Sequence, residues 1–74
     1  MEDVIQFELR DGADGFIQLI QLLKATGCVE TGGEAQAVVV DGLVIRNGEV
    51  ELRKRAKCVA GDVVEFDGYR IEVK

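Results

Sequence analysis

The amino-acid sequence predicts an α+β domain in which two short packed helices lie against a small antiparallel sheet of hairpins. Apolar residues alternate with polar ones at the start of the chain, then recur at helical spacing, and alternate again after Gly42. Two dipeptides that favour tight hairpin turns, Asn47-Gly48 and Asp67-Gly68, lie in the later part. This order of strand, helix, helix and several short strands is typical of helices that cover a sheet.

The N-terminal residues predict a half-buried strand followed by a turn. Ile5, Phe7 and Leu9 are apolar, and polar residues alternate with them. Asp11-Gly12 is a turn signal, and Asp14 can cap a following helix by accepting a hydrogen bond from a main-chain amide. We therefore expect the first helix to begin close to Asp14.

The first helix is predicted by an apolar stripe and by its end. Apolar side chains recur at the three- and four-residue spacing of one helix face, at Phe16, Leu19, Ile20 and Leu23. Gly27 suits a left-handed residue just after the helix. The simplest interpretation of the stripe is hydrophobic core.

The second helix is predicted from its ends, because its middle, Val38-Val39-Val40, is β-branched and would also suit a strand. Thr31-Gly32-Gly33-Glu34 matches a capping box, in which the Thr hydroxyl accepts a hydrogen bond from the amide three residues later and the Glu reaches back. Gly42 would close the helix. Ala35 then shares a face with Val38 and Val39 toward the first helix.

Two hairpins are predicted in the second half of the chain. A two-residue turn at Asn47-Gly48 forms two apolar pairs on one face, Ile45 with Val50 and Leu43 with Leu52. It also places Arg46 opposite Glu49 as an exposed pair. A three-residue turn would instead bring Val44 and Arg46 to the inner side, so the register stays open. The second hairpin turns at Asp67-Gly68 and pairs two apolar residues with two others, Val64 and Phe66 with Tyr69 and Ile71.

The composition argues against catalysis and metal binding. The 74 residues, interpreted as one domain over 1–74, include no Ser and no His, so neither a Ser-His-Asp nor a Cys-His nucleophile can be assembled. Cys28 and Cys58 are too few for a zinc site or a disulfide framework, and they suit free thiols in a reducing compartment. We expect a non-enzyme with no cofactor and no metal. Because no apolar run reaches membrane-spanning length and no leader opens the chain, we expect a cytoplasmic protein that binds no membrane.

The densest charge in the chain is basic, although the net charge is −5. Four of the five residues from Arg53 to Lys57 are cationic, and in an extended segment Arg53, Arg55 and Lys57 would project to one side and Lys54 to the other. Such a run is a candidate phosphate-binding surface. The alternative is a solvated strand edge that is kept basic to prevent edge-to-edge pairing.

Three motifs follow one another along the chain: Thr31-Gly32-Gly33-Glu34-Ala35, then Gly42 with Val44 and Asn47-Gly48, and finally Gly61-Asp62-Val63-Val64. They resemble the RNA-binding domain first named from ribosomal protein S-four. In that family a Ser-Arg-x-x-Ala helix start leads to Gly-x-Val-x-Val-Asn-Gly and then to Gly-Asp-x-Val. The matching region is 14–66, between an N-terminal strand and turn at 1–13 and the end of the C-terminal hairpin at 67–74.

The resemblance implies an αL-type RNA-binding fold, in which paired helices and a hairpin bind structured RNA such as rRNA or tRNA. The short length and the run from Val50 to Arg55 are most similar to the free-standing, single-domain YbcJ-like members. Taken with the charge pattern, the resemblance predicts RNA contacts from Arg53, Lys54, Arg55, Lys57, Arg46, Lys24 and Gln36. It also leads us to expect a monomer associated with the ribosome or with tRNA.

The chain departs from the wider family at three positions. Gly32 and Gln36 stand where the family often has cations, so the second helix has no positive charge. Arg46 stands where the pattern expects an apolar strand residue, and it is either a substitute cation or a sign of a different register.

The sequence also bears on three other classes of function. A DNA-reading helix would need side chains that reach base edges, and the second helix offers only Gln36, so we expect no DNA binding. A β-grasp carrier shares Asn47-Gly48 and Gly61-Asp62-Val63 but acts through a C-terminal Gly-Gly, whereas this chain ends in Ile71-Glu72-Val73-Lys74. A protein-interaction module that uses the same cations on an acidic partner stays open.

Overall fold

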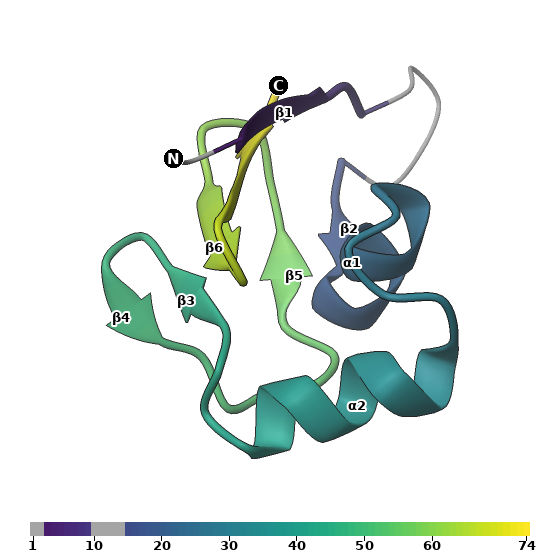
Figure 1. Ribbon diagram of the computed structural model, residues 1–74. Coiled ribbons are helices and arrows are strands. Elements are labelled where there is room, and N and C mark those ends of the chain that lie inside the picture. The colour runs from purple at the N-terminus through teal and green to yellow at the C-terminus, as the bar shows by residue number, and fades with distance from the viewer. Residues whose placement is uncertain (1–2, 10–14) are drawn as a thin grey trace.

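The computed structural model of the chain describes residues 3–9 and 15–74. Its strands form one five-stranded sheet, in the order β1-β7-β6-β3-β4, and one two-stranded sheet of β2 and β5. Both helices lie to one side of the five-stranded sheet, with β5 between that sheet and β2 (Figure 1). The elements are β1 (Asp3–Phe7), β2 (Ile17–Gln18), α1 (Leu19–Ala25), α2 (Gly32–Val40), β3 (Ile45–Arg46), β4 (Glu49–Val50), β5 (Lys57–Cys58), β6 (Val63–Phe66) and β7 (Tyr69–Val73).

The α+β class and both hairpins are confirmed, but the five-stranded sheet is mixed and not wholly antiparallel. Strand β1 pairs in parallel with β7, with Ile5 opposite Ile71 and Phe7 opposite Val73. The alternation of Ile5, Phe7 and the following Leu9 is the reason that β1 joins there, because these side chains pack on the core cluster from one face of the strand.

The first helix begins later than the sequence predicted. Ile17 and Gln18 are extended and pair with Cys58 and Lys57 of β5, so the helix starts only at Leu19. Its N-cap, Gln18, makes no side-chain capping hydrogen bond. The predicted cap Asp14 and the turn Asp11-Gly12 lie outside the described residues.

The second helix and its caps are as predicted. The Thr31 hydroxyl accepts a hydrogen bond from the Glu34 amide at 3.1 Å, and the Glu34 carboxylate accepts one from the Glu30 amide at 3.1 Å. A Gly in the left-handed region follows each helix, since Gly27 has φ +79° and Gly42 has φ +75°. Ala35 and Val39 of α2 are fully buried.

The first hairpin has the predicted register but the opposite face turned inward. The two-residue turn pairs Ile45 with Val50 and Arg46 with Glu49, with left-handed φ values at Asn47 and Gly48. However, Val44 is fully buried and Arg46 is half-buried, whereas the predicted apolar face is exposed: Leu43, Ile45, Val50 and Leu52. Arg46 thus lies opposite Glu49 as predicted, but the expectation that this pair is exposed is wrong for Arg46, because its side chain faces the interior.

One apolar core joins both helices to the five-stranded sheet. Its fully buried members include Leu19, Leu22 and Leu23 of α1, with Val64 and Ile71 contributed by the second hairpin. In the second hairpin Val64 pairs with Ile71 and Phe66 with Tyr69, as predicted. Within the described residues, no helix has the length and apolar character that crossing a bilayer requires.

Candidate functional site

The cationic segment, residues 53–57, lies between β4 and β5 and is attached to the start of α1. The Leu19 amide donates to the Ala56 carbonyl at 2.8 Å, and the Ile20 amide donates to the Lys54 carbonyl at 3.3 Å. These bonds occupy amides that the first turn of a helix cannot pair internally. The late start of α1 is thus the feature that fixes the cationic segment against the helix.

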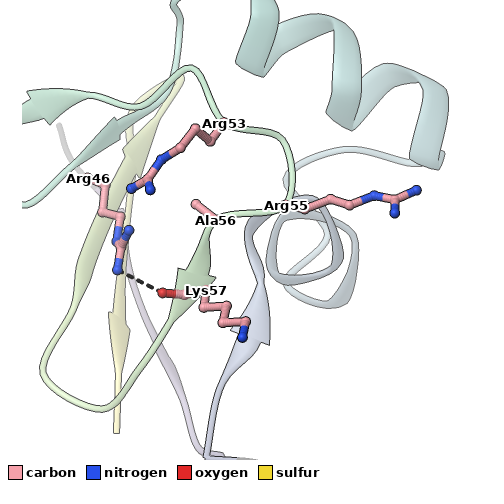
Figure 2. A pocket seen from close by; sticks show the side chains of 5 residues that line it. All are labelled: Arg46, Arg53, Arg55, Ala56 and Lys57. Atoms are coloured by element: carbon pink, nitrogen blue, oxygen red, sulfur yellow. Dashed lines mark hydrogen bonds between the residues drawn. The ribbon is translucent and has the colours of Figure 1, made fainter.

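The segment is not extended, so the predicted division of its side chains is wrong. A turn at Lys54 and Arg55 separates Arg53 from Lys57. In Figure 2 the side chains of Arg53 and Arg55 leave the segment in opposite directions.

A surface hollow of about 510 Å³ lies beside this segment (Figure 2). Four of its five lining residues are cationic, and the lining is Arg46, Arg53, Arg55, Ala56 and Lys57. The chain as a whole has a net charge of −5, so the positive charge of this hollow contrasts with the rest of the molecule. Its chemistry suits a polyanion.

The remaining predicted residues do not share that hollow. Lys54 is exposed at the tip of the turn, and Gln36 is exposed on α2. Lys24, in the last turn of α1, lines a separate hollow with Gln21 and Ala25. The structure therefore groups four of the seven predicted contacts, and it leaves Lys24 and Gln36 on other parts of the surface.

Within the hollow, Lys57 is held by an aromatic ring. Its ammonium nitrogen lies 4.8 Å from the centroid of the Phe16 ring, which is within the range of a cation–π interaction. The ring supports the stem and restricts the position of the charge. Lys57 forms no ion pair among the described residues, so its charge stays available to a ligand.

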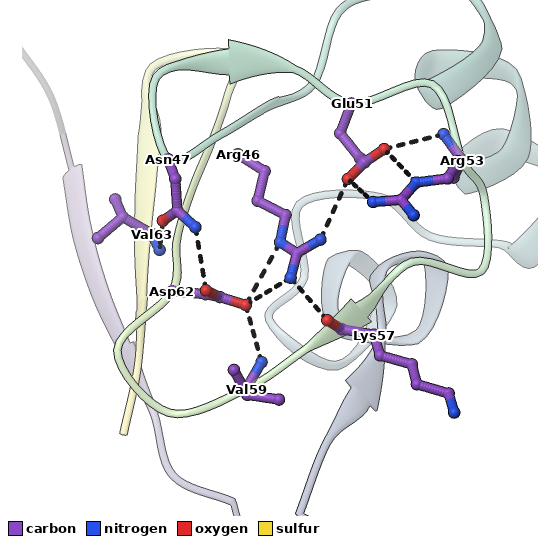
Figure 3. Close-up of polar contacts among 8 residues, drawn as sticks. All are labelled: Arg46, Asn47, Glu51, Arg53, Lys57, Val59, Asp62 and Val63. Atoms are coloured by element: carbon purple, nitrogen blue, oxygen red, sulfur yellow. Dashed lines mark hydrogen bonds and ion pairs between the residues drawn. The ribbon is translucent and has the colours of Figure 1, made fainter.

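Arg46 has a different role, because its guanidinium is bound within the protein (Figure 3). It donates to the Asp62 carboxylate at 2.9 and 3.3 Å, to the Glu51 carboxylate at 3.1 Å, and to the Lys57 carbonyl at 2.7 Å. Only 18% of its side chain is exposed. The hydrogen bonds that Arg46 donates to the Asp62 carboxylate are the main cause of the raised pKa of Arg46, which stays charged.

Asp62 fixes the first hairpin to the loop before β6. Besides Arg46, its carboxylate accepts from the Asn47 side chain at 3.0 Å and from the Val59 amide at 2.8 Å. Asn47 in turn accepts from the Val63 amide at 2.8 Å. Burial alone would raise the pKa of Asp62, but the hydrogen bonds from Asn47, Val59 and Arg46 outweigh it and lower that pKa below its ordinary value.

Glu51 links Arg46 to the cationic segment. It accepts from the Arg53 side chain at 3.1 and 3.2 Å and from the Arg53 amide at 3.2 Å. The Arg53 side chain is the largest cause of the lowered pKa of Glu51, about 2; burial opposes the shift, and the Arg53 amide and Arg46 reinforce it. Hydrogen bonds thus link four side chains in series, from Asp62 through Arg46 and Glu51 to Arg53, and we call these four residues the Arg46 network. This network sets the shape of the hollow.

Sequence reasoning did not find the roles of Asp62, Glu51 and Asn47. A signal was present: the family pattern Gly-x-Val-x-Val-Asn-Gly places Val44 and position 46 on the same face of the strand, and Val44 is a core residue. An Arg on an inward-facing position needs buried partners, and the carboxylates of Glu51 and Asp62 provide them.

Both thiols are free, with Cys28 half-buried and Cys58 fully buried. Burial is the main cause that raises the pKa of the Cys58 thiol to about 11. At neutral pH Cys58 is therefore a neutral core side chain and a poor nucleophile.

Comparisons with known proteins identify the family. Residues 7–74 match the sequence profile described as the S4 domain. The chain belongs to the S4 domain family.

The relatives that match are small proteins of similar length. YbcJ of Escherichia coli K12 and YbcJ of Shigella flexneri are each 40% identical over 62 residues, which cover 84% of this chain and 89% of the relative. The solution structure of Escherichia coli YbcJ matches with a TM-score of 0.71 at 38% identity, and the match covers 99% of this chain and 90% of YbcJ. That YbcJ structure is described as containing an αL motif involved in RNA binding. The predicted αL-type fold is thereby confirmed for this chain.

Proposed function

We propose that this protein is a non-catalytic RNA-binding protein whose cationic segment contacts the phosphates of folded RNA. The observation that carries the proposal is a hollow on an otherwise acidic molecule that four cationic residues line, namely Arg46, Arg53, Arg55 and Lys57. The RNA-binding motif described for the related YbcJ structure supports it. We extend the proposal to residues 1–74 as a single domain, monomeric and cytoplasmic, and the two free thiols support that location.

The proposal divides the cations by role. Lys54 and Arg55 are exposed and form no ion pair within residues 3–9 and 15–74, so they contact phosphate directly. Lys57 does so from its position over Phe16. Arg53 is 76% exposed even while it binds Glu51, and its guanidinium keeps N–H groups that can reach solvent.

Arg46 positions the others in this proposal and does not itself bind RNA. Four hydrogen bonds already occupy its guanidinium, which has five N–H groups. Moving it to a phosphate would leave the Asp62 carboxylate, which is 11% exposed, without its charged partner. Lys24 and Gln36 contribute at most to the rim of the interface, because they line no part of the hollow.

Folded RNA suits the site better than single strands or DNA. Base stacking requires exposed rings, whereas Phe16 supports Lys57, and Phe66 and Tyr69 are half-buried in the second hairpin. Helix α2 has no cation, so it does not supply a helix that reads base edges in a DNA groove. Folded RNA is recognised through shape and phosphates, and the proposed targets are therefore rRNA or tRNA.

Fluorescence anisotropy with labelled nucleic acids tests this choice. The probes are an unmodified tRNA transcript, an rRNA hairpin, oligouridine, and a DNA duplex of matched length, all in the same buffer. We expect measurable binding of at least one folded RNA and weaker binding of oligouridine and DNA. Equal affinity for all four probes would show that the protein binds nucleic acids only by unspecific charge attraction. Tighter binding of oligouridine than of folded RNA would contradict the proposed preference for folded RNA.

A further inference from the structure

The outer face of the five-stranded sheet has apolar residues at its two edges, more of them at the β4 edge, and charged residues in the middle. In register across the strands lie Val50, Ile45, Glu65, Arg70 and Val4, on the face opposite the core. The first two belong to the first hairpin, where Leu43 and Leu52 are also 55% and 60% exposed. We call Leu43, Ile45, Val50 and Leu52 the hairpin patch.

The members of the hairpin patch lie close together. Val50 and Ile45 are cross-strand partners. A Cβ added to Gly42 would lie 3.8 Å from Val50 and 4.0 Å from Leu52, so the chain before β3 runs beside both. A contiguous group of exposed aliphatic side chains is a candidate interaction surface.

A hollow of about 200 Å³ adjoins the patch and adds a second kind of chemistry. Leu43 and Ile45 line it together with the second hairpin turn, which contributes Glu65, Phe66, Asp67, Gly68 and Tyr69. The carboxylates of Glu65 and Asp67 form no ion pair with any described residue, and no cation lines the hollow. The site therefore combines aliphatic walls with two unpaired negative charges.

We propose that the hairpin patch and this hollow form a docking surface for a segment of another protein in which aliphatic and basic side chains alternate. Aliphatic side chains of that segment cover Leu43 and Ile45, and its ammonium or guanidinium groups face Glu65 and Asp67. The charge identifies the partner: a nucleic acid would be repelled by the two carboxylates. A second copy docked by two-fold symmetry would bring the same carboxylates against one another.

NMR titration of the ¹⁵N-labelled protein tests the proposal. The probe is a seven-residue peptide in which Lys alternates with Leu and Val, and the matched probe has Glu in place of each Lys. We expect the Lys peptide to shift the amide signals of Leu43, Ile45, Glu65 and Tyr69, and the Glu peptide to leave them unchanged.

Matched variants separate apolar contact from charge. Leu43→Ser should weaken binding of the Lys peptide roughly fivefold, while Val4→Ser, at the other edge of the same face, should not. Glu65→Gln with Asp67→Asn should weaken it by a similar factor, which corresponds to two exposed ion pairs, whereas the equally charged control Glu8→Gln with Glu30→Gln should not.

Several outcomes would overturn the proposal. Binding of the Glu peptide as tightly as the Lys peptide would show unspecific adhesion, and absence of shifts at millimolar peptide would leave the surface without this ligand. Dimerisation of the free protein that Leu43→Ser abolishes, measured by sedimentation, would make a second copy the occupant. Shifts of the same four amides on addition of folded RNA would assign the surface to RNA. The proposed RNA-binding function can hold or fail independently of these results, because the cationic segment lies outside this surface.

Discussion

Arg46 and Arg55 have the same guanidinium group and line the same hollow, yet their surroundings are opposite. Arg46 is half-buried and makes four hydrogen bonds within the protein, whereas Arg55 is exposed and has no ion pair among the described residues. The difference shows that a cation near a binding surface can be there to shape it. Removing the first kind of cation should damage the fold, and removing the second should damage only binding.

The largest effect is expected from the acidic partner of Arg46. Asp62→Ala removes the acceptor of Arg46, Asn47 and the Val59 amide and leaves a half-buried guanidinium without its main counterion. We expect the free energy of unfolding to fall by about 3 kcal/mol. Urea unfolding followed by circular dichroism measures it, with Asp41→Ala as the control, because the Asp41 side chain is exposed and forms no ion pair with any described residue. A midpoint equal to that of the control would show that the Arg46 network contributes little to stability.

The next effect is a pH dependence that comes from Glu51. Its pKa is about 2 in the folded protein and about 4.5 when unfolded, so its ionised form stabilises the fold above pH 4.5, and that stability is lost as the pH falls toward 2. The lowered pKa of Asp62 acts in the same direction. We expect protonation of Glu51 to lower the free energy of unfolding by on the order of 1–2 kcal/mol. The effect is no larger because Arg53, its main partner, is largely in solvent, which screens their interaction.

Unfolding midpoints measured between pH 6 and pH 2.5 check this prediction. Glu51→Gln should flatten the profile and lower the stability at pH 6, while Glu49→Gln, a neighbouring and exposed carboxylate, should leave the profile as it is. Parallel profiles for the parent protein and Glu51→Gln would contradict the role of Glu51.

The smallest effect on stability is expected from the exposed cations. Lys54→Gln with Arg55→Gln removes two charges that have no ion partner among the described residues, so the free energy of unfolding should change by less than about 0.5 kcal/mol. Thermal unfolding of this double variant measures the change. A loss as large as that from Asp62→Ala would show that the two sets of cations do not differ.

Local sequence signals predicted much of the fold because local geometry decides those features. Thr31 caps α2, and the left-handed φ values of Asn47 and Asp67 fit the two predicted turns. The features that were missed depend on contacts between distant residues. Ile17 fits both a helical stripe and a strand, and its pairing with Cys58 decides for the strand. The parallel pairing of β1 with β7 likewise joins the two ends of the described chain.

The sequence predicted which cations belong to the site, but it did not predict that Arg46 is bound within the protein while the others are exposed. The sequence shows that Arg53, Lys54, Arg55 and Lys57 are clustered, and three of them line one hollow. It does not show which face of the first hairpin is inward, since a period of two gives two faces and each contains apolar residues. In the structure Val44 is buried in the core, so its face of the strand is the inward one. Arg46 lies on that same face and therefore contacts Glu51 and Asp62.

The salt dependence of RNA binding tests the central claim most directly. Affinity for the best folded RNA is measured from 50 to 300 mM KCl for the parent, for Lys54→Gln with Arg55→Gln, and for the equally charged control Arg70→Gln with Lys74→Gln, in which Arg70 lies on the outer face of the sheet. With roughly three to five phosphate contacts, the parent should give a slope of log K against log salt of about −2 to −4. The Lys54 and Arg55 variant should bind more weakly and lose about one to two units of slope, while the control keeps the parent slope. Identical slopes for all three proteins would contradict the assignment of phosphate contacts to the cationic segment.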